Sequence, residues 1–240
     1  MEFYFIRHGQ SENNQRWALT GSYHGRNDDP ALTDLGREQA RRLGDFLRQP
    51  GSAAGEGLPD LQNVGGFDIT HLYCSLMVRA VATGTAVSRA LGLPLVAWMD
   101  AHEVGGIHQV DRESGERHGL PGRNRAYFEE HFPSLVLPDS LGDGGWWNRP
   151  FESREQRLDR ARRFVSDLLI RHGDGDDRVA VISHGGFCNC IVRAIFGLPQ
   201  GDHTWFSLNN VGITRIDFEG GTTWLAYANR VGFLPPEMIT

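Results

Sequence analysis

The sequence contains no lysine: all of its 24 basic residues, in a chain of 240, are arginine. This absence excludes the lysine of a P-loop nucleotide site and every enzyme that forms a Schiff base through lysine. Acidic residues outnumber basic ones, and the net charge of −6 argues against broad binding of nucleic acid or of membrane surfaces. We therefore expect neither nucleic acid nor a membrane as a partner.

Cysteine and long apolar runs are also scarce. Cys74, Cys188 and Cys190 cannot form a disulfide framework, and the last two are one residue apart in an expected helix, where they point to different faces. No stretch approaches the roughly 18 apolar residues that cross a bilayer. The first residues lack the basic leader and small-residue cleavage site of a signal peptide, so we expect a cytoplasmic protein.

Three short apolar runs predict buried strands, and each run ends in residues that suit phosphate. Residues 2–6 lead into Arg7-His8-Gly9, residues 69–74 into Ser75, and residues 178–182 into Ser183-His184-Gly185. Ligands of open α/β sheets bind beyond the carboxyl ends of the strands, so this coincidence indicates a binding site there.

Amphipathic segments alternate with these strands and predict helices over residues 33–47, 76–91, 153–172 and 186–196. Thr33 is an N-cap candidate, and Gly92 provides a C-terminal signal. Residues 212–218 and 223–228 are expected to form a hairpin that turns at two glycines. The pattern predicts an α/β fold, namely a mostly parallel three-layer α/β/α sandwich in a single domain of residues 1–240.

Two segments interrupt the alternation. Residues 50–67 are rich in glycine, proline and alanine, which is typical of a surface loop, and residues 100–150 are interpreted as an inserted cover over the site. Trp146 and Trp147 either recognise a substrate or pack the insertion onto the domain. Most of the arginines of the insertion are expected to be solvated, and they are Arg112, Arg117, Arg123, Arg125 and Arg149.

Phosphoryl transfer sets clear requirements for a site. The moving group carries negative charge on three oxygens, so without a metal it needs fixed cations, a nucleophile and a proton donor for the leaving oxygen. A histidine can attack phosphorus through one ring nitrogen when an acceptor holds its other N–H. Arg7-His8-Gly9 supplies a cation, that nucleophile and a backbone that phosphate can approach closely. Alone the tripeptide is weak evidence, because roughly 0.1 chance copies are expected in such a chain.

Residues further along the chain strengthen the hypothesis. Arg79 lies in the first turn of the helix after a strand and can reach the same anion, although a surface salt bridge is the commoner role. His184 precedes a helix whose N-terminus adds partial positive charge, and its ring would stabilise the anion either protonated or as an N–H donor. Glu103 follows a short strand at about 94–98 and is the best-placed candidate acid, although a lone glutamate is more often solvated.

Five motifs in this order resemble the histidine phosphatase superfamily, also called phosphoglycerate mutase-like proteins. They are Arg7-His8-Gly9 with its continuation to Asn14, the segment from Asp29 to Ala40, Ser75 to Ala80, Glu103, and Ser183-His184-Gly185. The resemblance spans about residues 3–216, and five ordered motifs are far more specific than any single one.

The resemblance implies roles for the matching residues of this chain. His8 would become phosphohistidine, and Glu103 would protonate the leaving group and then activate water. The phosphate pocket would consist of Arg7, Gly9, Asn14, Arg79, His184 and Gly185. Asn14 enters through the resemblance alone, and a turn-forming asparagine is the other interpretation.

The resemblance leaves phosphatase and mutase open. Mutases of the family usually carry a T-G-W-x-D-x-x-L stretch, whereas this chain has Thr20-Gly21-Ser22-Tyr23, so we favour a metal-independent phosphomonoester hydrolase. We expect no cofactor, no metal and a small phosphorylated substrate as the partner, and a homodimer is left open.

Two other classes of function are weighed. One is a metal hydrolase that uses His8, His102, Glu103 and His184 as ligands, and no His-x-x-x-His pair supports it. The other is a non-catalytic phosphate-binding protein, whose signature would be a broken catalytic set, whereas here the set is intact.

Overall fold

The fold is built on one seven-stranded sheet. The structure is a computed structural model that describes residues 1–22, 24–52, 60–111, 113–199 and 204–240. The strands of the sheet are β1 (Glu2–Arg7), β2 (His71–Cys74), β3 (Leu95–Ala97), β6 (Leu135–Val136), β7 (Arg178–Ser183), β8 (Ile213–Glu219) and β9 (Thr222–Arg230). Their order is β6-β3-β2-β7-β1-β8-β9.

The sheet is mostly parallel, as predicted. The β1, β2, β3, β6 and β7 strands all run in one direction, and β8 and β9 add an antiparallel hairpin beside β1. The hairpin forms as expected, with both turn glycines at positive φ. Because β2, β7 and β1 are neighbours, the three polar strand ends predicted from the sequence meet at one edge of the sheet.

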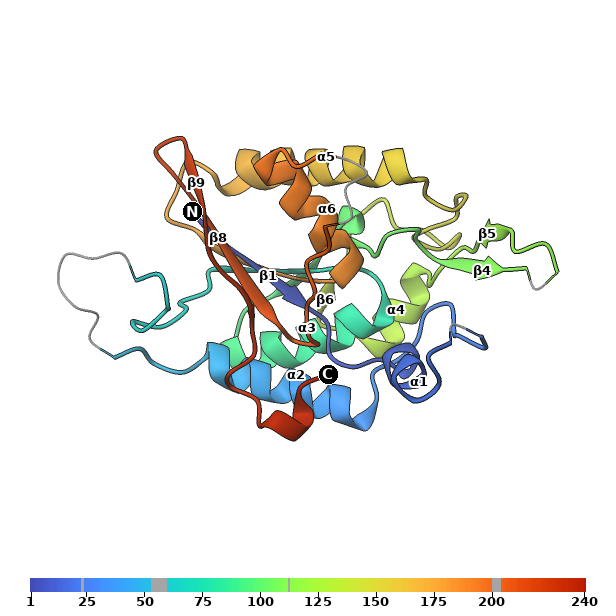
Figure 1. Ribbon diagram of the computed structural model, residues 1–240, viewed down its shortest axis with the longest axis horizontal. Coiled ribbons are helices and arrows are strands. Elements are labelled where there is room, and N and C mark those ends of the chain that lie inside the picture. Colours follow the sequence, from blue (N-terminus) through green and yellow to red (C-terminus); the bar gives the residue numbers. More distant parts are fainter. Residues whose placement is uncertain (23, 53–59, 112, 200–203) are drawn as a thin grey trace.

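Helices cover both faces of the sheet, which confirms the three-layer α/β/α sandwich (Figure 1). One face carries α2 (Asp34–Leu47) and α3 (Val78–Leu91), and the other carries α5 (Arg154–His172) and α6 (Gly185–Phe196). Strand β1 shows why: Phe3 and Phe5 pack with the α5 and α6 side chains, while Tyr4 and Ile6 pack with those of α2 and α3. Successive strand residues point to opposite faces, so an uninterrupted apolar run fits a strand buried on both.

Local signals define the helix ends. Thr33 caps α2 through its side chain, Ser153 and Gln156 form a capping box on α5, and Gly92 ends α3 in the left-handed conformation. Among the described residues, no helix combines the length and the apolar composition that crossing a bilayer requires.

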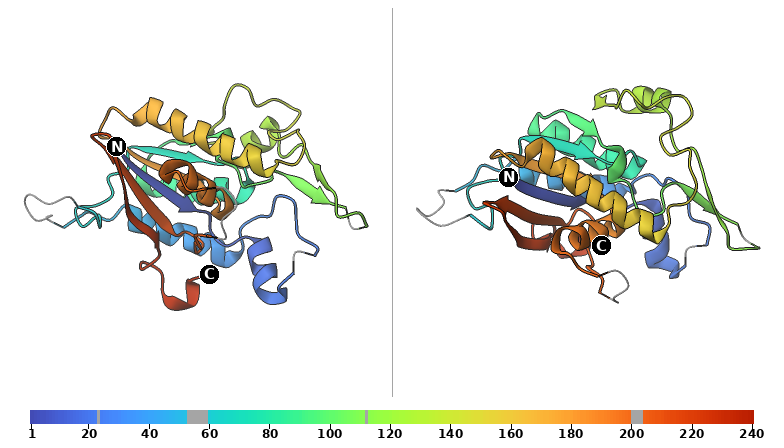
Figure 2. Two further views of the ribbon diagram at one scale, coloured as in Figure 1. Left: turned by 45° about the horizontal axis from the view of Figure 1, so that its top comes forward. Right: turned by 90° about the horizontal axis from the view of Figure 1, so that it is seen from above.

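The region expected to cover the site contains small elements that its weak periodicity did not reveal. They are a 3₁₀ turn (Met99–Ala101), β4 (His108–Val110), β5 (Arg117–Gly119), α4 (Arg125–His131) and β6. Figure 2 shows β4, β5 and α4 projecting on the side of the molecule where α1 (Glu12–Thr20) also lies. Strand β6 departs from the expectation of a pure insertion, because it pairs with β3 and joins the main sheet. Part of the expected 50–67 loop, residues 53–59, lies outside the described residues.

Candidate active site

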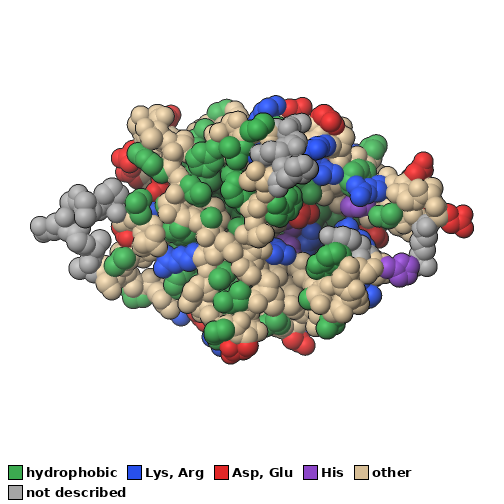
Figure 3. Space-filling model, viewed as in Figure 1, with side chains coloured by type: hydrophobic (Ala, Val, Ile, Leu, Met, Phe, Trp, Pro, Cys, Tyr) green, Lys and Arg blue, Asp and Glu red, His purple; other side chains and the backbone are tan. Residues whose placement is uncertain are grey.

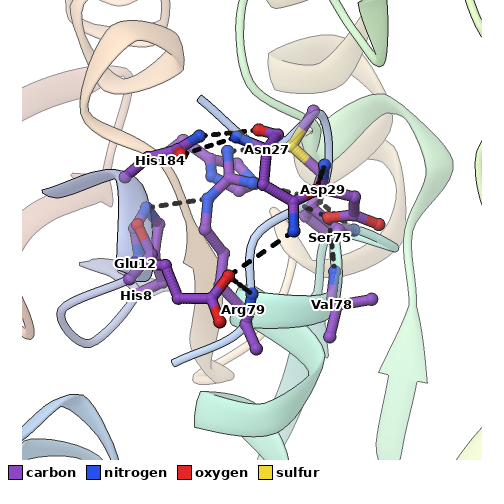
Figure 4. Close-up of polar contacts among 12 residues, drawn as sticks. His8, Glu12, Asn27, Asp29, Ser75, Val78, Arg79 and His184 are labelled. Carbon is purple, nitrogen blue, oxygen red and sulfur yellow. Dashed lines mark hydrogen bonds and ion pairs between the residues drawn. The ribbon is translucent and has the colours of Figure 1, made fainter. Parts of the chain in front are cut away.

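The predicted phosphate-binding residues converge at the carboxyl ends of β1, β2 and β7. His8 follows β1, Ser75 follows β2 and His184 follows β7, while Arg79 reaches in from the first turn of α3 (Figure 4). The His8 and His184 rings are 5.1 Å apart between centroids. In the space-filling view, arginine, histidine and acidic side chains gather in a recess near the centre of the face shown (Figure 3).

The contacts of His8 fix which ring nitrogen is available as a nucleophile. Its Nδ1 lies 2.6 Å from the Gly9 carbonyl oxygen, which only accepts, so Nδ1 carries the proton. Its Nε2 receives the Nε–H of Arg79 at 3.1 Å and therefore presents a lone pair. Burial lowers the pKa of His8 well below its usual value, and the guanidinium groups of Arg79 and Arg7 lower it further. The ring is neutral, as attack on phosphorus requires.

Arg79 is held in place by its own anionic partner. It is almost fully buried, and its Nη1 lies 3.7 Å from Oδ1 of Asp29, which also accepts the Val78 backbone N–H at 3.0 Å. Burial raises the pKa of Asp29 to about 6, against the lowering effect of Arg79. Asp29 belongs to the second family motif, and the structure gives it a contact with the cation that faces His8.

Glycine at position 9 is required by the packing of the backbone around it. A Cβ built on Gly9 would lie 2.5 Å from the Gly36 carbonyl oxygen in α2, so packing against that helix requires the glycine. Its N–H already donates to Thr83 Oγ1 at 3.0 Å. Close backbone packing thus requires glycine at this position, whether or not phosphate also approaches it.

His184 is oriented by the serine at the end of β2. Its Nε2 lies 2.9 Å from Ser75 Oγ, and its Nδ1 is buried without a hydrogen-bond partner among the described residues. Burial lowers the pKa of His184 well below the usual value, and the charge of Arg79 adds to that effect. The ring is thus neutral, so of the two expected forms the N–H donor is the one that the environment favours.

Glu103 caps the helix that was expected to face the phosphate. Its Oε1 accepts the N–H groups of Val104 and Phe187 at 2.8 and 2.9 Å, and its Oε2 accepts that of Gly186 at 3.3 Å. The positive end of α6 is therefore directed at this carboxylate. Burial lowers the pKa of both Arg7 and Arg79, and the charge of Glu103 opposes that lowering, which places Glu103 in the same electrostatic site. Oε2, with a single long contact, is the oxygen with room for a proton.

Arg7 and Gly185 lie close to each other. Nη1 of Arg7 donates to the Leu208 carbonyl oxygen, and a Cβ built on Gly185 would lie 3.7 Å from its Nε. The guanidinium is thus anchored by one nitrogen and remains charged, although burial lowers its pKa.

Asn14 has a structural role in addition to its place near the backbone of His8. It is the third residue of α1, and it forms a capping box with Ser11. Its Oδ1 also accepts from Asn210 Nδ2 at 3.3 Å, and the same nitrogen donates to the His8 carbonyl oxygen at 2.9 Å. Asn210 therefore ties the start of α1 to the backbone of His8.

Sequence reasoning missed Thr83, Asp29 and Asn210 as parts of this site. Thr83 is fully buried one turn after Arg79 in α3, and its hydroxyl donates to the Arg79 carbonyl oxygen while it holds the Gly9 N–H. A buried threonine at i+4 from a functional arginine is a usable signal. Asn210 gives no such signal, because its partners are about 200 residues away.

Within the expected cover, His102 packs against both tryptophans and one arginine. This buried ring lies 4.7 and 5.6 Å from the rings of Trp147 and Trp146, and its Nε2 is 3.4 Å from Arg149 Nη2. Both tryptophans are buried in the core, so the structure favours packing over substrate recognition for their rings. Burial and the charge of Arg160 lower the pKa of His102 well below the usual value.

The arginines of the cover differ in their surroundings. Arg125 donates to the Leu141 and Pro138 carbonyl oxygens and is structural. Arg117, Arg123 and Arg149 each stack on an aromatic ring, at 4.7, 4.6 and 4.1 Å respectively. Arg112 lies outside the described residues. Apart from Arg125, the described members are exposed, as expected.

The four ligands of the competing metal-hydrolase hypothesis do not gather as a cluster in the described part of the chain. The group there that meets a metal-binding arrangement is His71, His172 and Asp177, which lies elsewhere.

Three neutral buried histidines predict that acid destabilises the fold. The pKa values of His8, His102 and His184 are all depressed, so below about pH 6.5 the unfolded chain binds protons that the folded chain does not. The contribution of these histidines to the free energy of unfolding is fully present above that pH and is lost as pH falls. Between pH 7 and 5 each contributes a loss of at most about 2 kcal/mol, and the raised pKa of Asp29 offsets about 1 kcal/mol.

Urea unfolding at pH 7 and 5 measures this difference. We expect His184→Asn to lose less stability than the wild type over this interval, and the exposed control His131→Gln to lose the same amount. An equal loss in His184→Asn and the wild type would show that this histidine is not held neutral.

Comparison with known proteins finds relatives that match most of the chain. The family model described as histidine phosphatase superfamily (branch 1) matches residues 3–54 and 61–230. A protein of Hydrogenobacter thermophilus with the provisional name phosphoserine phosphatase 2 is 27% identical over 237 residues, which cover 95% of each chain. A protein of Salmonella paratyphi A with the provisional name phosphoglycerate mutase GpmB is 25% identical over 227 residues, which cover 94% of this chain and 88% of that one.

A solved structure shows the same fold. Phosphoserine phosphatase from Entamoeba histolytica, in complex with 3-phosphoglyceric acid, superposes with a TM-score of 0.59 and covers 98% of this chain and 99% of that one. The two sequences are 18% identical, so this likeness concerns the fold.

Proposed function

The chain belongs to branch 1 of the histidine phosphatase superfamily, and on this premise we propose that it is a metal-independent phosphomonoester hydrolase that acts through a phosphohistidine on His8. The observation that carries the proposal is the pair of contacts on the His8 ring. The Gly9 carbonyl oxygen holds the Nδ1 proton, and the lone pair of Nε2 faces the Arg79 guanidinium. The nitrogen that would attack phosphorus is thus in direct contact with a cation that can bind the phosphate oxygens.

In the first step, the Nε2 lone pair of His8 forms a bond to phosphorus as the bond to the leaving oxygen breaks. Arg79 turns its Nε–H from the ring to a phosphate oxygen, and Arg7 and His184 add donors that stabilise the charge on the other oxygens. Glu103 gives a proton from Oε2 to the leaving oxygen. The proton on Nδ1 stays on that nitrogen and donates to the Gly9 carbonyl oxygen throughout.

In the second step, Glu103 takes a proton from water, and the water oxygen attacks phosphorus. The bond between phosphorus and Nε2 breaks, and its electron pair returns to His8. Inorganic phosphate leaves, and Glu103 is protonated for the next cycle. The capping contacts of Glu103 with α6 fix the position of the carboxylate in both steps.

Cations around the phosphate support a substrate with a second negative group. The charge of Arg26 contributes to lowering the pKa of Arg79, and that of Arg149 does the same for His102. The charge of Arg123 opposes the burial that raises the pKa of Asp29. Nε of Arg26 is buried and has no hydrogen-bond partner among the described residues. A carboxylate on the leaving group would satisfy such donors. Phosphoserine and 3-phosphoglycerate are small phosphomonoesters of this kind.

A panel of phosphomonoesters tests the proposed function. We expect phosphate release from phosphoserine or 3-phosphoglycerate with a kcat/KM at least about tenfold above that for glycerol phosphate, because the carboxylate adds one charge-assisted contact. A chelator should leave the rates unchanged. Loss of activity in chelator would favour the metal hydrolase, and tight phosphate binding without turnover of any ester would favour the non-catalytic protein.

A mutase is the second candidate, because one relative carries that provisional name. The same panel separates the two functions, since a mutase converts 3-phosphoglycerate to its 2-phospho isomer and retains the phosphate. We expect phosphate release to be much faster than isomer formation.

Glu103→Gln tests the proton donor. The amide keeps an oxygen that can accept from the α6 backbone but cannot donate a carboxylic proton, so we expect a loss of about 10²- to 10⁴-fold with alkyl esters. Esters with acidic phenol leaving groups need no proton, and phosphorylation of His8 by them should slow far less. Burst kinetics with both ester classes measure this step, and equal slowing for both would contradict the acid role.

A further inference from the structure

A second cluster of ionisable side chains lies at the edge of the sheet opposite His8. His71 begins β2, His172 ends α5, and Asp177 lies in the loop between α5 and β7. These positions are where β2 and β7 start, whereas His8 follows the end of the parallel strand β1. In Figure 1 the end of α5 lies toward the start of β1, away from α1. The proposed phosphate chemistry gives this cluster no task.

Asp177 lies between the two imidazoles and contacts both. Its Oδ2 is 2.7 Å from His172 Nδ1, and its Oδ1 is 3.7 Å from His71 Nδ1. One nitrogen or oxygen from each of the three residues lies within 4.8 Å of the other two. Ligand atoms around a tetrahedral ion with bonds of about 2.0 Å are roughly 3.3 Å apart, so small side-chain rotations suffice. The His71 side chain is 42% exposed, and its Nδ1 would exchange a hydrogen bond of 2.9 Å with Thr70 Oγ1 for the ion.

Tyr73 gives the buried ligand the support that metal-bound histidines usually have. Its hydroxyl lies 3.0 Å from His172 Nε2, on the side of the ring opposite Asp177. With an ion on Nδ1, the ring proton would reside on Nε2 and donate to this hydroxyl, which fixes the tautomer and the ring orientation. Both His172 and Tyr73 are buried, so this contact is held by the core.

The local charge also favours a cation. Asp174 and Asp176 are exposed in the same short loop as Asp177. The two neighbouring arginines have other partners. Arg171 stacks on the Trp98 ring at 4.3 Å, and Arg178 pairs with Asp68 at 2.8 Å. An approaching ion therefore meets an acidic surface.

We propose that His71, His172 and Asp177 form a binding site for a divalent transition metal of the zinc class, with water in the remaining position. Two imidazoles and one carboxylate suit Zn²⁺, Co²⁺ and Ni²⁺, whereas Mg²⁺ and Ca²⁺ prefer oxygen ligands. The ion would join the end of α5 to the starts of β2 and β7. Because these ligands come together only in the folded chain, binding stabilises the fold by mass action.

Titration of the purified full chain with Zn²⁺ in a calorimeter, and with Co²⁺ by visible absorption, tests the site. We expect one equivalent to bind and the midpoint of thermal unfolding to rise with Zn²⁺ concentration. His71→Gln and Asp177→Asn should each abolish both effects, and Tyr73→Phe should weaken affinity by about tenfold or more. His131→Gln, which removes an exposed histidine outside the cluster, should bind as the wild type does.

Absence of stoichiometric Zn²⁺ binding to the wild type would overturn the proposal, as would binding that His71→Gln and Asp177→Asn leave intact. Equal affinity for Mg²⁺ would contradict the assigned metal class. Activity provides an independent readout: phosphate release by His71→Gln, measured well below its unfolding temperature, should equal that of the wild type. A metal ion acting in catalysis at His8 would make activity depend on chelator in both proteins.

Discussion

His8→Ala should reduce the rate of phosphate release by a factor on the order of 10⁴ to 10⁶, because the reaction then has no nucleophile to divide it into two steps. The same variant should remain folded, since the ring contacts one carbonyl oxygen and one guanidinium rather than the apolar core. Removing a neutral buried histidine should also make the fold less sensitive to acid.

Steady-state rates with near-ultraviolet circular dichroism as the folding check measure this effect. The matched control is His131→Gln, which removes an exposed histidine of α4 and should retain full activity. A folded His8→Ala protein with more than about one hundredth of the wild-type rate would be incompatible with nucleophilic catalysis by His8.

Arg79→Gln should lower kcat/KM by about 10³- to 10⁵-fold, the range in which an arginine stabilises a phosphoryl group in transfer. Removing this guanidinium also removes the largest charge effect that depresses the pKa of His8. The acidic limb of the pH profile of kcat/KM should therefore move to higher pH, because protonated His8 cannot attack.

Arg79→Lys separates charge from geometry at this position. A lysine keeps the charge but loses the fork that binds two oxygens, so its activity should lie between those of Arg79→Gln and the wild type. The pH profile of the lysine variant should stay close to that of the wild type. A wild-type kcat/KM in Arg79→Gln would rule out contact between this residue and the transferred phosphate.

Much of the fold could be predicted because the chain carries strong local signals. Apolar strands that alternate along the chain with capped helices define the layers. The rule that ligands bind beyond the carboxyl ends of strands brings His8, Ser75 and His184 together. The order of the strands then determines whether these residues are neighbours, and β2, β7 and β1 are indeed adjacent.

The details that sequence could not provide are contacts between distant segments. Glu103 caps α6 across more than 80 residues, and Asn210 links Asn14 to the backbone of His8 across about 200. Gly9 is required by the carbonyl oxygen of Gly36, a close approach that depends on how α2 packs. No local propensity encodes such pairings, because they arise only after tertiary packing.

The expected cover shows a second limit of sequence reasoning. Its short elements have two to seven residues, too few for a clear period, and the return of β6 to the main sheet depends on pairing with β3. The sequence leaves Trp146 and Trp147 open to either packing or substrate recognition. Their burial against the ring of His102 favours packing.

Trapping the covalent intermediate tests the central claim most directly. Protein quenched during turnover of a ³²P-labelled phosphomonoester should carry label that is lost in acid and retained in base, as a phosphorus–nitrogen bond requires, and peptide mapping should place it on His8. Wild-type protein should be labelled at a substantial fraction of one phosphate per chain, and His8→Ala should carry none. Absence of label from actively turning-over protein, or label that persists in His8→Ala, would contradict a phosphohistidine at this residue.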